Sequence, residues 1–175
     1  SGIYAINTRD GRKFLSVPET GDISVNMGQV SVVPGEILVS VNSNNFLGLN
    51  INMGNPHAVV FVDDLDLVGD LRQAPTVTPA DEYPEGVNTE FVKFLEGNKI
   101  QMRVHERGVG ETQSCGTGTC AVALAATIKK GKSLPIKWEI NPPGGRLIVE
   151  IDGHSNATLT GPAELVKEVE LDKYL

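Results

Sequence analysis

The sequence predicts an α+β fold in which many short, mostly antiparallel strands curl around one central helix. Three observations predict it. Short segments rich in β-branched and aromatic residues, several of them with alternating apolar and polar positions, recur along most of the chain. Turn-forming residues separate these segments at close intervals. One stretch alone, 117–130, spaces its apolar residues as a helix does, and its middle has no side chain that prefers water, which indicates burial on most sides.

The first part of the chain is expected to consist of strands. Asp10-Gly11 favours a two-residue hairpin between the first two strands. Further turns are expected at Pro34-Gly35 and at the polar segment 42–45. The predicted strands are 3–8, 13–17, 22–27, 30–33, 36–41, 46–51 and 58–62.

The middle of the chain contains two irregular segments. The acidic stretch 63–70 lacks the spaced oxygen ligands and terminal glutamate of an EF-hand, so it is interpreted as a solvated turn or short helix. The segment 73–85 contains three prolines and is expected to be a rigid surface connection. Strands follow at 87–95, 99–104, 136–140, 146–151 and 157–160, with a final strand expected somewhere within 166–175.

The predicted helix has signals at both ends. Thr117 and Thr119 are candidate N-terminal caps. Lys129 and Lys130 place positive charge in the last turn, and Gly131 provides a stop. A helix beginning near Thr117 therefore points unpaired backbone N–H groups toward the loop that precedes it.

Composition narrows the class of partner. A formal net charge of −7 argues against nucleic acid or an anionic membrane surface, and favours a small-molecule ligand. The sequence has no apolar run of transmembrane length, and its start lacks the pattern of a signal peptide. Cys115 and Cys120 are expected to be free thiols, which predicts a cytoplasmic protein. Because the chain enters a strand pattern directly from Ser1, it is expected to be either a piece of something longer or a chain with an expression scar.

The loop before the helix has the composition of an anion-binding site. Glycines at 108, 110, 116 and 118 allow the backbone to approach a ligand closely. Cys115 stands where the helix dipole is expected to lower a thiol pKa, so it is a candidate nucleophile or general acid/base. Glu106 and Arg107 stand on the approach, where they could orient charged groups of a substrate.

Each candidate also has an ordinary structural interpretation. Cys115 could be a small buried hydrophobe, Glu106 and Arg107 a surface ion pair, and His57 a turn residue, whereas Cys120 is interpreted as packing. Two cysteines with His105 match no common zinc-ligand spacing. The G-T-G-T segment is too short for a dinucleotide fingerprint, and there is no Walker lysine. No metal or cofactor is therefore predicted, and the reaction type stays open at this point.

Three separated motifs resemble the diaminopimelate epimerase family. The segment E-R-G-V-G-E-T-Q-S-C-G-T-G-T-C-A at 106–121 is similar to the family's second catalytic-cysteine signature. M-G-N-P-H at 53–57 and G-V-N-T-E-F at 86–91 match two further stretches of the family in order and distance. The resemblance extends over essentially the whole chain.

This resemblance implies a cofactor-independent isomerase that interconverts LL- and meso-diaminopimelate for lysine and peptidoglycan biosynthesis. Family members have two lobes, each a strand-wrapped helix, with the substrate between two cysteines, and they are expected to form homodimers. It implies that Cys115 is catalytic, assisted by Glu106 and His57. It also implies a substrate-binding set of Asn55, Asn88, Glu106, Arg107, Gly116 and Thr117.

The sequence departs from the family in having no first-lobe cysteine motif. Cys115 and Cys120 belong to one segment and cannot flank a carbon from opposite faces. The chain is therefore expected to be the C-terminal portion of an epimerase, inactive as an isolated fragment. On this view 28–161 form the second lobe, and 1–27 and 162–175 belong to a missing N-terminal lobe. The alternatives are a related racemase acting on proline or another amino acid, and a non-catalytic anion-binding lobe.

Overall fold

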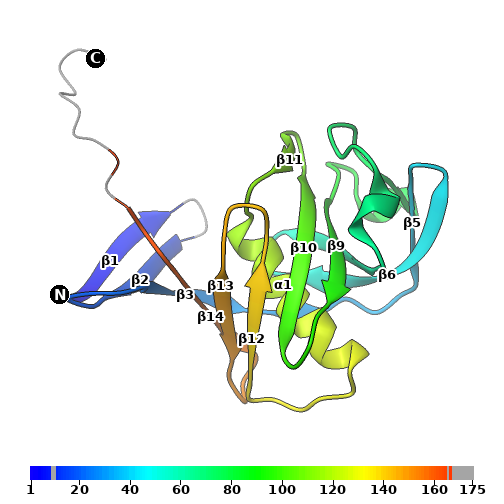
Figure 1. The fold of residues 1–175 in the computed structure, drawn as a ribbon. Coiled ribbons are helices and arrows are strands. Elements are labelled where there is room, and N and C mark those ends of the chain that lie inside the picture. Colours follow the sequence, from blue (N-terminus) through cyan, green and yellow to red (C-terminus); the bar gives the residue numbers. More distant parts are fainter. Residues whose placement is uncertain (9–10, 165, 167–175) are drawn as a thin grey trace.

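The computed structural model describes residues 1–8, 11–164 and 166. Over these residues, fourteen strands form one mixed sheet accompanied by one α-helix, α1 (Gly116–Lys129), and two short 3-10 helices, η1 (Leu65–Val68) and η2 (Ala80–Glu82) (Figure 1). The strands are β1 (Gly2–Thr8), β2 (Gly11–Val17), β3 (Ile23–Gln29), β4 (Ser31–Val32), β5 (Ile37–Val41), β6 (Asn44–Asn52), β7 (Pro56–Phe61), β8 (Thr76–Thr78), β9 (Asn88–Phe94), β10 (Lys99–Glu106), β11 (Gly110–Thr112), β12 (Ile136–Asn141), β13 (Leu147–Ile151) and β14 (Asn156–Gly161).

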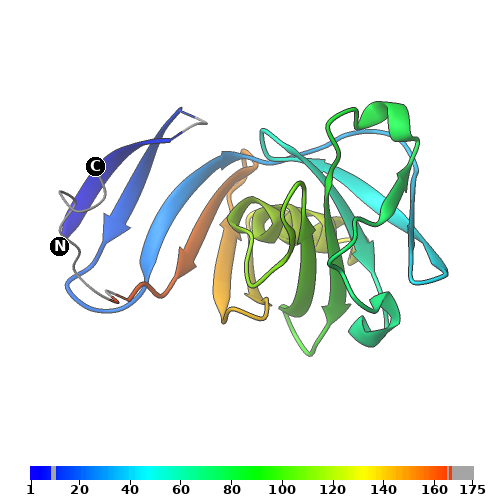
Figure 2. The same ribbon diagram turned by 90° about the horizontal axis from the view of Figure 1, so that it is seen from above.

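The sheet follows the order β1-β2-β3-β14-β13-β12-β10-β9-β7-β6-β5-β8, with β11 paired to β10 and β4 to β6. Its pairs are antiparallel except for two, β7 with β9 and β10 with β12, which are parallel. The prediction of mostly antiparallel strands with one helix is confirmed. Seen from above, the middle strands of the sheet curve past α1, which packs against one face of the sheet (Figure 2).

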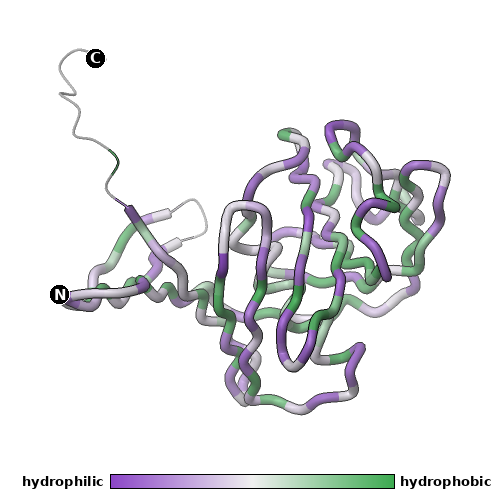
Figure 3. Tube along the Cα trace, in the orientation of Figure 1, coloured by the Kyte–Doolittle hydropathy of each residue, from purple (hydrophilic) through white to green (hydrophobic). Residues whose placement is uncertain are grey.

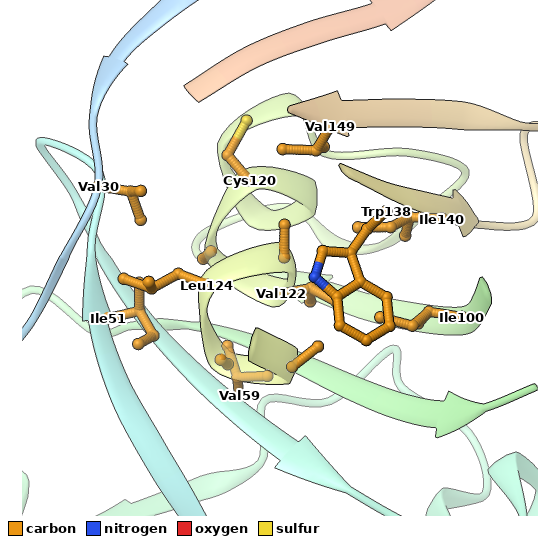
Figure 4. Packing of buried hydrophobic residues seen from close by; sticks show 14 of the residues in the cluster. Val30, Ile51, Val59, Ile100, Cys120, Val122, Leu124, Trp138, Ile140 and Val149 are labelled. Carbon is orange, nitrogen blue, oxygen red and sulfur yellow. The ribbon is translucent and has the colours of Figure 1, made fainter. Parts of the chain in front are cut away.

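α1 packs against β6, β7, β9, β12, β13 and β14. All residues from Gly118 to Thr127 are buried, as the lack of charge in this stretch predicted. Figure 4 shows the strand side chains Ile51, Val59 and Trp138, together with Val30 between β3 and β4, directed at the helix. The Trp138 indole donates from Nε1 to Thr127 Oγ1 at 2.9 Å, so the largest buried side chain is also hydrogen-bonded.

A second core lies on the other face of the sheet. Val59 belongs to the cluster around α1, whereas its neighbours Ala58 and Val60 belong to a cluster with Ile37 and Phe91. Successive side chains of a strand point to opposite faces, so β7 and β9 are covered on both. This explains why β7 has a continuous apolar stretch, 58–61, instead of a clean alternation.

The first strands stand apart from this body. β1 and β2 project beside it, and only β3 joins the rest of the sheet, by pairing with β14 (Figures 1 and 2). Ile3 is 78% exposed, and Tyr4 and Phe14 are each 52% exposed. Apolar segments are visible along this projecting part of the chain in Figure 3.

The structure corrects several sequence-based expectations. α1 begins at Gly116 and its N-cap is Cys115, not Thr117 or Thr119. The Thr119 hydroxyl instead donates to the Cys115 carbonyl at 2.7 Å, inside the helix. The proline-rich segment 73–85 is more regular than expected, since it contains β8 and η2.

Other expectations hold or lie beyond the description. The acidic stretch, expected to be a solvated turn or short helix, contains the short helix η1, capped by Asp64, but Leu65 and Val68 of this helix are buried. β1 and β2 pair as an antiparallel hairpin, as expected, but Thr8 lies opposite Gly11, so Gly11 belongs to β2 and not to the turn predicted at Asp10-Gly11. Asp10 lies outside the described residues. The strand expected within 166–175 also lies outside them, apart from Val166. No helix in the described part of the chain is long and apolar enough to cross a membrane.

Candidate functional site

Cys115 closes the loop that leads from β11 into α1. Its backbone is extended, with φ −128° and ψ 115°, as an N-cap residue requires. Its Sγ accepts a hydrogen bond from Gly118 N at 3.3 Å and lies 3.5 Å from Thr117 Oγ1. The sulfur thus takes the place of the oxygen that usually caps a helix, with the Gly118 N–H as its donor and the Thr117 hydroxyl within hydrogen-bond distance.

Burial raises the pKa of the Cys115 thiol, and the negative charges of Glu90 and Glu106 act in the same direction. The hydrogen bonds from Thr117 and Gly118 oppose this by lowering the pKa. The expectation that the helix N-terminus lowers this pKa is therefore wrong for the described chain. Cys115 is only 7% exposed, and desolvation of the thiolate outweighs the donors.

A chain of polar side chains leads from the interior to Cys115. His57 on β7 is fully buried, and its Nδ1 lies 2.7 Å from Glu90 Oε1 on β9. His57 Nε2 lies 3.0 Å from Asn55 Oδ1, and Asn55 Nδ2 donates to Thr117 Oγ1 at 3.4 Å. His57 is therefore not merely a turn residue, because it connects a buried carboxylate to the first turn of α1.

Gly118 makes room for this arrangement. A Cβ at this position would lie 2.5 Å from Glu90 Oε1 and 3.2 Å from Cys115 Sγ. No side chain fits at that distance without displacing a neighbour, so the absence of a Cβ allows the carboxylate and the thiol to approach the same turn of the helix.

Three further predicted residues lie where β9 begins and β10 ends: Asn88 is the first residue of β9, Glu106 is the last of β10, and Arg107 follows it. Asn88 is buried, accepts from Arg107 N at 2.9 Å and donates from Nδ2 to Pro56 O at 3.4 Å. The Arg107 side chain pairs with the exposed Glu85 at 3.5 Å. Glu106 accepts a hydrogen bond from Thr112. Glu106 and Arg107 thus have separate partners, in place of the surface ion pair that was the alternative interpretation.

Two hollows flank Tyr83 beside these residues. One, of about 350 Å³, is lined by Asn50, Asn52, Gly54, Asn55 and Glu82 among others. The other, of about 230 Å³, is lined by Glu85, His105 and Arg107 among others. Burial raises the pKa of Tyr83 to about 12. Asn55 lines the first hollow and Arg107 the second, whereas Cys115 lines neither.

Two further residues have structural roles. Cys120 is fully buried in α1, and burial raises its pKa to about 12, which agrees with its interpretation as packing. His105 donates from Nδ1 to Leu71 O at 2.7 Å and is 5% exposed. The residues that the structure describes contain no group of three His, Cys, Asp or Glu side chains able to hold a metal ion.

Sequence reasoning missed Glu90. It lies within the motif at 86–91, but it was assigned no role. The signal was a charged residue inside a strand whose neighbours are apolar or small, since a carboxylate in such a place is rarely buried without a partner.

Comparison with known proteins gives the chain a family. The sequence profile of the family described as "Diaminopimelate epimerase" matches residues 49–166. A diaminopimelate epimerase of Streptomyces coelicolor is 44% identical over 98% of this chain and 61% of its own length. One of Neisseria meningitidis is 35% identical over 95% of this chain and 64% of its own length. The chain therefore spans about three fifths of the length of these curated relatives.

Solved structures show the same fold at low identity. A probable proline racemase from Agrobacterium radiobacter has a TM-score of 0.67 at 17% identity, covering 98% of this chain and 61% of its own. A hydroxyproline epimerase from Agrobacterium vitis has a TM-score of 0.66 at 14% identity, covering 91% of this chain and 57% of its own.

Proposed function

The chain belongs to the diaminopimelate epimerase family, and we propose that it is the second catalytic lobe of an enzyme that interconverts LL- and meso-diaminopimelate in lysine and peptidoglycan biosynthesis. The observation that carries the proposal is Cys115 at the N-cap of a buried helix, with its sulfur hydrogen-bonded to the Gly118 N–H and to the Thr117 hydroxyl. A thiol in this position can exchange a proton with a carbon held in front of the helix.

The chemistry requires a thiol on each face of the α-carbon. In one direction the Cys115 thiolate removes the α-proton, and a cysteine of the first lobe, as thiol, donates a proton to the opposite face. In the other direction the roles are exchanged. The backbone N–H groups of Gly116 and Thr117 would bind the α-carboxylate and stabilise the negative charge that develops beside it. No cofactor is needed for these transfers.

Two side chains would assist the proton transfer. The Glu106 carboxylate lies close enough for its charge to act on Cys115. His57 reaches Cys115 only through Asn55 and Thr117. We therefore assign Glu106 a direct part in the acid/base chemistry and His57 an indirect one.

The distal end of diaminopimelate carries a second amino acid group, and Asn55, Asn88, Glu106 and Arg107 would bind it. Asn55 and Arg107 line the two hollows beside Tyr83. Asn88 joins them, because its side chain accepts from the Arg107 backbone. A set with both amide and charged groups is suited to a zwitterion, and this favours diaminopimelate over a shorter amino acid such as proline.

The architecture is part of the proposal. We propose a strand-wrapped α1 as the centre of a lobe spanning 28–161, with 1–27 and 162–175 belonging to the first lobe. The exposure of Ile3, Tyr4 and Phe14 supports this, since the first lobe would cover them. We further propose that the complete enzyme is a cytoplasmic homodimer, in which both cysteines stay reduced; both are free in this structure.

Proton exchange tests the proposal directly. The chain is mixed with a first-lobe polypeptide and diaminopimelate in deuterated water, and incorporation of deuterium at the α-carbon is followed by NMR. We expect exchange with the natural Cys115, at least a thousandfold less with Cys115→Ala, and little change with the matched control Cys120→Ala. A well-folded mixture that binds diaminopimelate without exchange would instead indicate a non-catalytic binding lobe.

Substrate choice separates the two racemase hypotheses. In the same assay, proline and hydroxyproline should show no exchange, because neither has the distal amino acid group. Exchange of proline in preference to diaminopimelate would replace the proposed substrate while leaving the role of Cys115 intact.

A further inference from the structure

The Glu90–His57 pair is completely buried and does not contact Cys115 directly, so the proposed proton transfer does not by itself explain why Glu90 is there. Both side chains are completely buried, and Glu90 Oε2 has no hydrogen-bond partner among the described residues. β7 and β9 run parallel with His57 opposite Asn88 and Val59 opposite Glu90, so both side chains share the face against α1. A buried carboxylate with a free oxygen is costly to keep, and a function for it must be sought.

Charge neutrality limits where the protons of this pair can be. A deprotonated Glu90 beside a neutral His57 would leave one buried, uncompensated negative charge. Burying an uncompensated charge is far more costly than burying a neutral or ion-paired group. The pair is therefore expected to carry no net charge, either as carboxylate and imidazolium or as carboxylic acid and imidazole.

Both neutral arrangements place a hydrogen on His57 Nε2, the ring nitrogen that faces away from Glu90. In the first, both ring nitrogens carry hydrogens. In the second, Glu90 donates to Nδ1, so the ring hydrogen is on Nε2. In each case Nε2 is a donor, which agrees with the Asn55 oxygen, an acceptor, lying 3.0 Å from it.

The direction of this hydrogen bond fixes those that follow. With its oxygen facing His57, the Asn55 amide turns its nitrogen toward Thr117 Oγ1, at 3.4 Å. The Thr117 hydroxyl accepts there, so its own hydrogen is available to Cys115 Sγ at 3.5 Å. If His57 Nε2 lacked a hydrogen, Asn55 would turn around, and Thr117 would donate to Asn55 instead of the sulfur.

We propose that Glu90 is a positioning residue, which acts through His57, Asn55 and Thr117 to direct the Thr117 hydroxyl hydrogen onto the sulfur of Cys115. This proposal rests on the proposed function for its importance, since a thiolate at Cys115 is the base of that reaction. Glu90 itself touches neither the sulfur nor the substrate in this scheme. In this scheme the Glu90–His57 hydrogen bond nevertheless determines whether the Thr117 hydroxyl is a donor to Cys115 Sγ.

The first test reads the protons of His57. ¹⁵N NMR of the histidine ring distinguishes a protonated from an unprotonated ring nitrogen, and it needs neither substrate nor turnover. We expect a hydrogen on His57 Nε2 at neutral pH. His105 is an internal reference in the same spectrum, because its ring bonds a backbone carbonyl and not a carboxylate. An unprotonated Nε2 on His57 would overturn the proposal.

The second test reads Cys115. Its alkylation rate by iodoacetamide is measured from about pH 6 to 10 in a Cys120→Ala background, where Cys115 is the remaining thiol. Glu90→Gln keeps the size of the side chain, but its amide can either donate to His57 Nδ1 or accept from it, so the direction of the relay is no longer fixed. We expect the midpoint of the pH profile to rise, with alkylation at neutral pH about three- to tenfold slower.

The sign of the shift separates the relay from simple electrostatics. The carboxylates that act on Cys115 are Glu106 on β10 and, in its charged form, Glu90 on β9, and both raise the pKa of Cys115. Cys120 is absent from the Cys120→Ala background. If Glu90 acted on Cys115 through charge alone, Glu90→Gln would lower the midpoint. A lowered or unchanged midpoint would therefore contradict the relay.

A double variant tests whether the effect passes through Thr117. Thr117→Val removes the last donor, so adding Glu90→Gln to it should produce no further rise in the midpoint. Thr117→Ser retains the hydroxyl and should preserve the effect of Glu90→Gln. An equal rise in the Thr117→Val background would show that Glu90 acts by another path. Because these measurements need no turnover, they can fail while deuterium exchange succeeds, and the reverse.

Discussion

The two ends of α1 are built on different principles. At the N-terminal end, glycine and small polar residues surround Cys115, and a buried carboxylate has an oxygen without a partner. At the C-terminal end, Trp138 is fully buried and hydrogen-bonded, and Lys129 and Lys130 lie over the rings of Phe61 and Phe94. One end of the helix contains buried polar groups, which we propose take part in proton transfer, while the other end supplies apolar packing.

Removing the anchor at the C-terminal end should give the largest change in stability. Trp138→Ala leaves a cavity against α1 and Thr127 without its indole partner, so we expect the free energy of unfolding to fall by about 3–5 kcal/mol. Urea denaturation followed by circular dichroism measures it. Under native conditions the pH profile of Cys115 alkylation should stay unchanged. A shifted profile would show that the two ends are not independent.

Adding one methyl group at the N-terminal end should mainly impair the site. In Gly118→Ala the new Cβ would meet Glu90 Oε1 at 2.5 Å, so the carboxylate must move. We expect about a hundredfold loss of α-proton exchange, as for a displacement of about 1 Å in an active site. Alanine is the better helix former by about 1 kcal/mol, so any loss of stability measures the clash.

A double variant isolates that clash. In a Glu90→Ala background, Gly118→Ala meets no carboxylate and should raise the melting temperature slightly. A fall equal to that in the Glu90 background would mean that another neighbour is responsible.

Between the two ends of α1, Cys120 should make the free energy of unfolding depend on pH in the alkaline range. Burial raises its pKa to about 12 from 9.0, so the folded state keeps the thiol proton after the unfolded state has lost it. The contribution to stability is complete below about pH 9 and is lost as the pH rises toward 12. The difference in unfolding free energy between the natural chain and Cys120→Ala should therefore shrink over this range. A constant difference would contradict the burial of this thiol.

The smallest change in stability is expected for Lys130, an exposed residue just after the last turn of α1. Lys130 Nζ lies 4.2 Å from the centre of the Phe94 ring. Lys130→Ala should lower the free energy of unfolding by less than about 1 kcal/mol, since such contacts are weak at solvent-exposed positions. Lys130→Arg retains the cation and should restore stability in the same urea titration. A loss of several kcal/mol would mean that this end depends on more than apolar burial.

Local features of the sequence were sufficient for much of the fold. The turns and apolar segments gave most strands, and the uncharged stretch before Lys129 gave the buried helix. The short strands β8 and β11 depend on their partners more than on their own residues, so they were not predicted, whereas β4 lies within the strand expected at 30–33. The helix start was misplaced because cysteine is not among the usual capping residues.

The sequence by itself determined that a cysteine precedes a buried helix, and its motifs determined the family. Only the tertiary structure decided what surrounds that cysteine. The parallel pairing of β7 with β9 brings His57 and Glu90 together, although 33 positions separate them. Asn55 and Thr117 then connect this pair to Cys115. Burial, a property of the whole lobe, then raises the pKa of Cys115 where the helix terminus alone predicted a fall. Desolvation depends on every neighbour in space, and a sequence specifies these neighbours only through the folded chain.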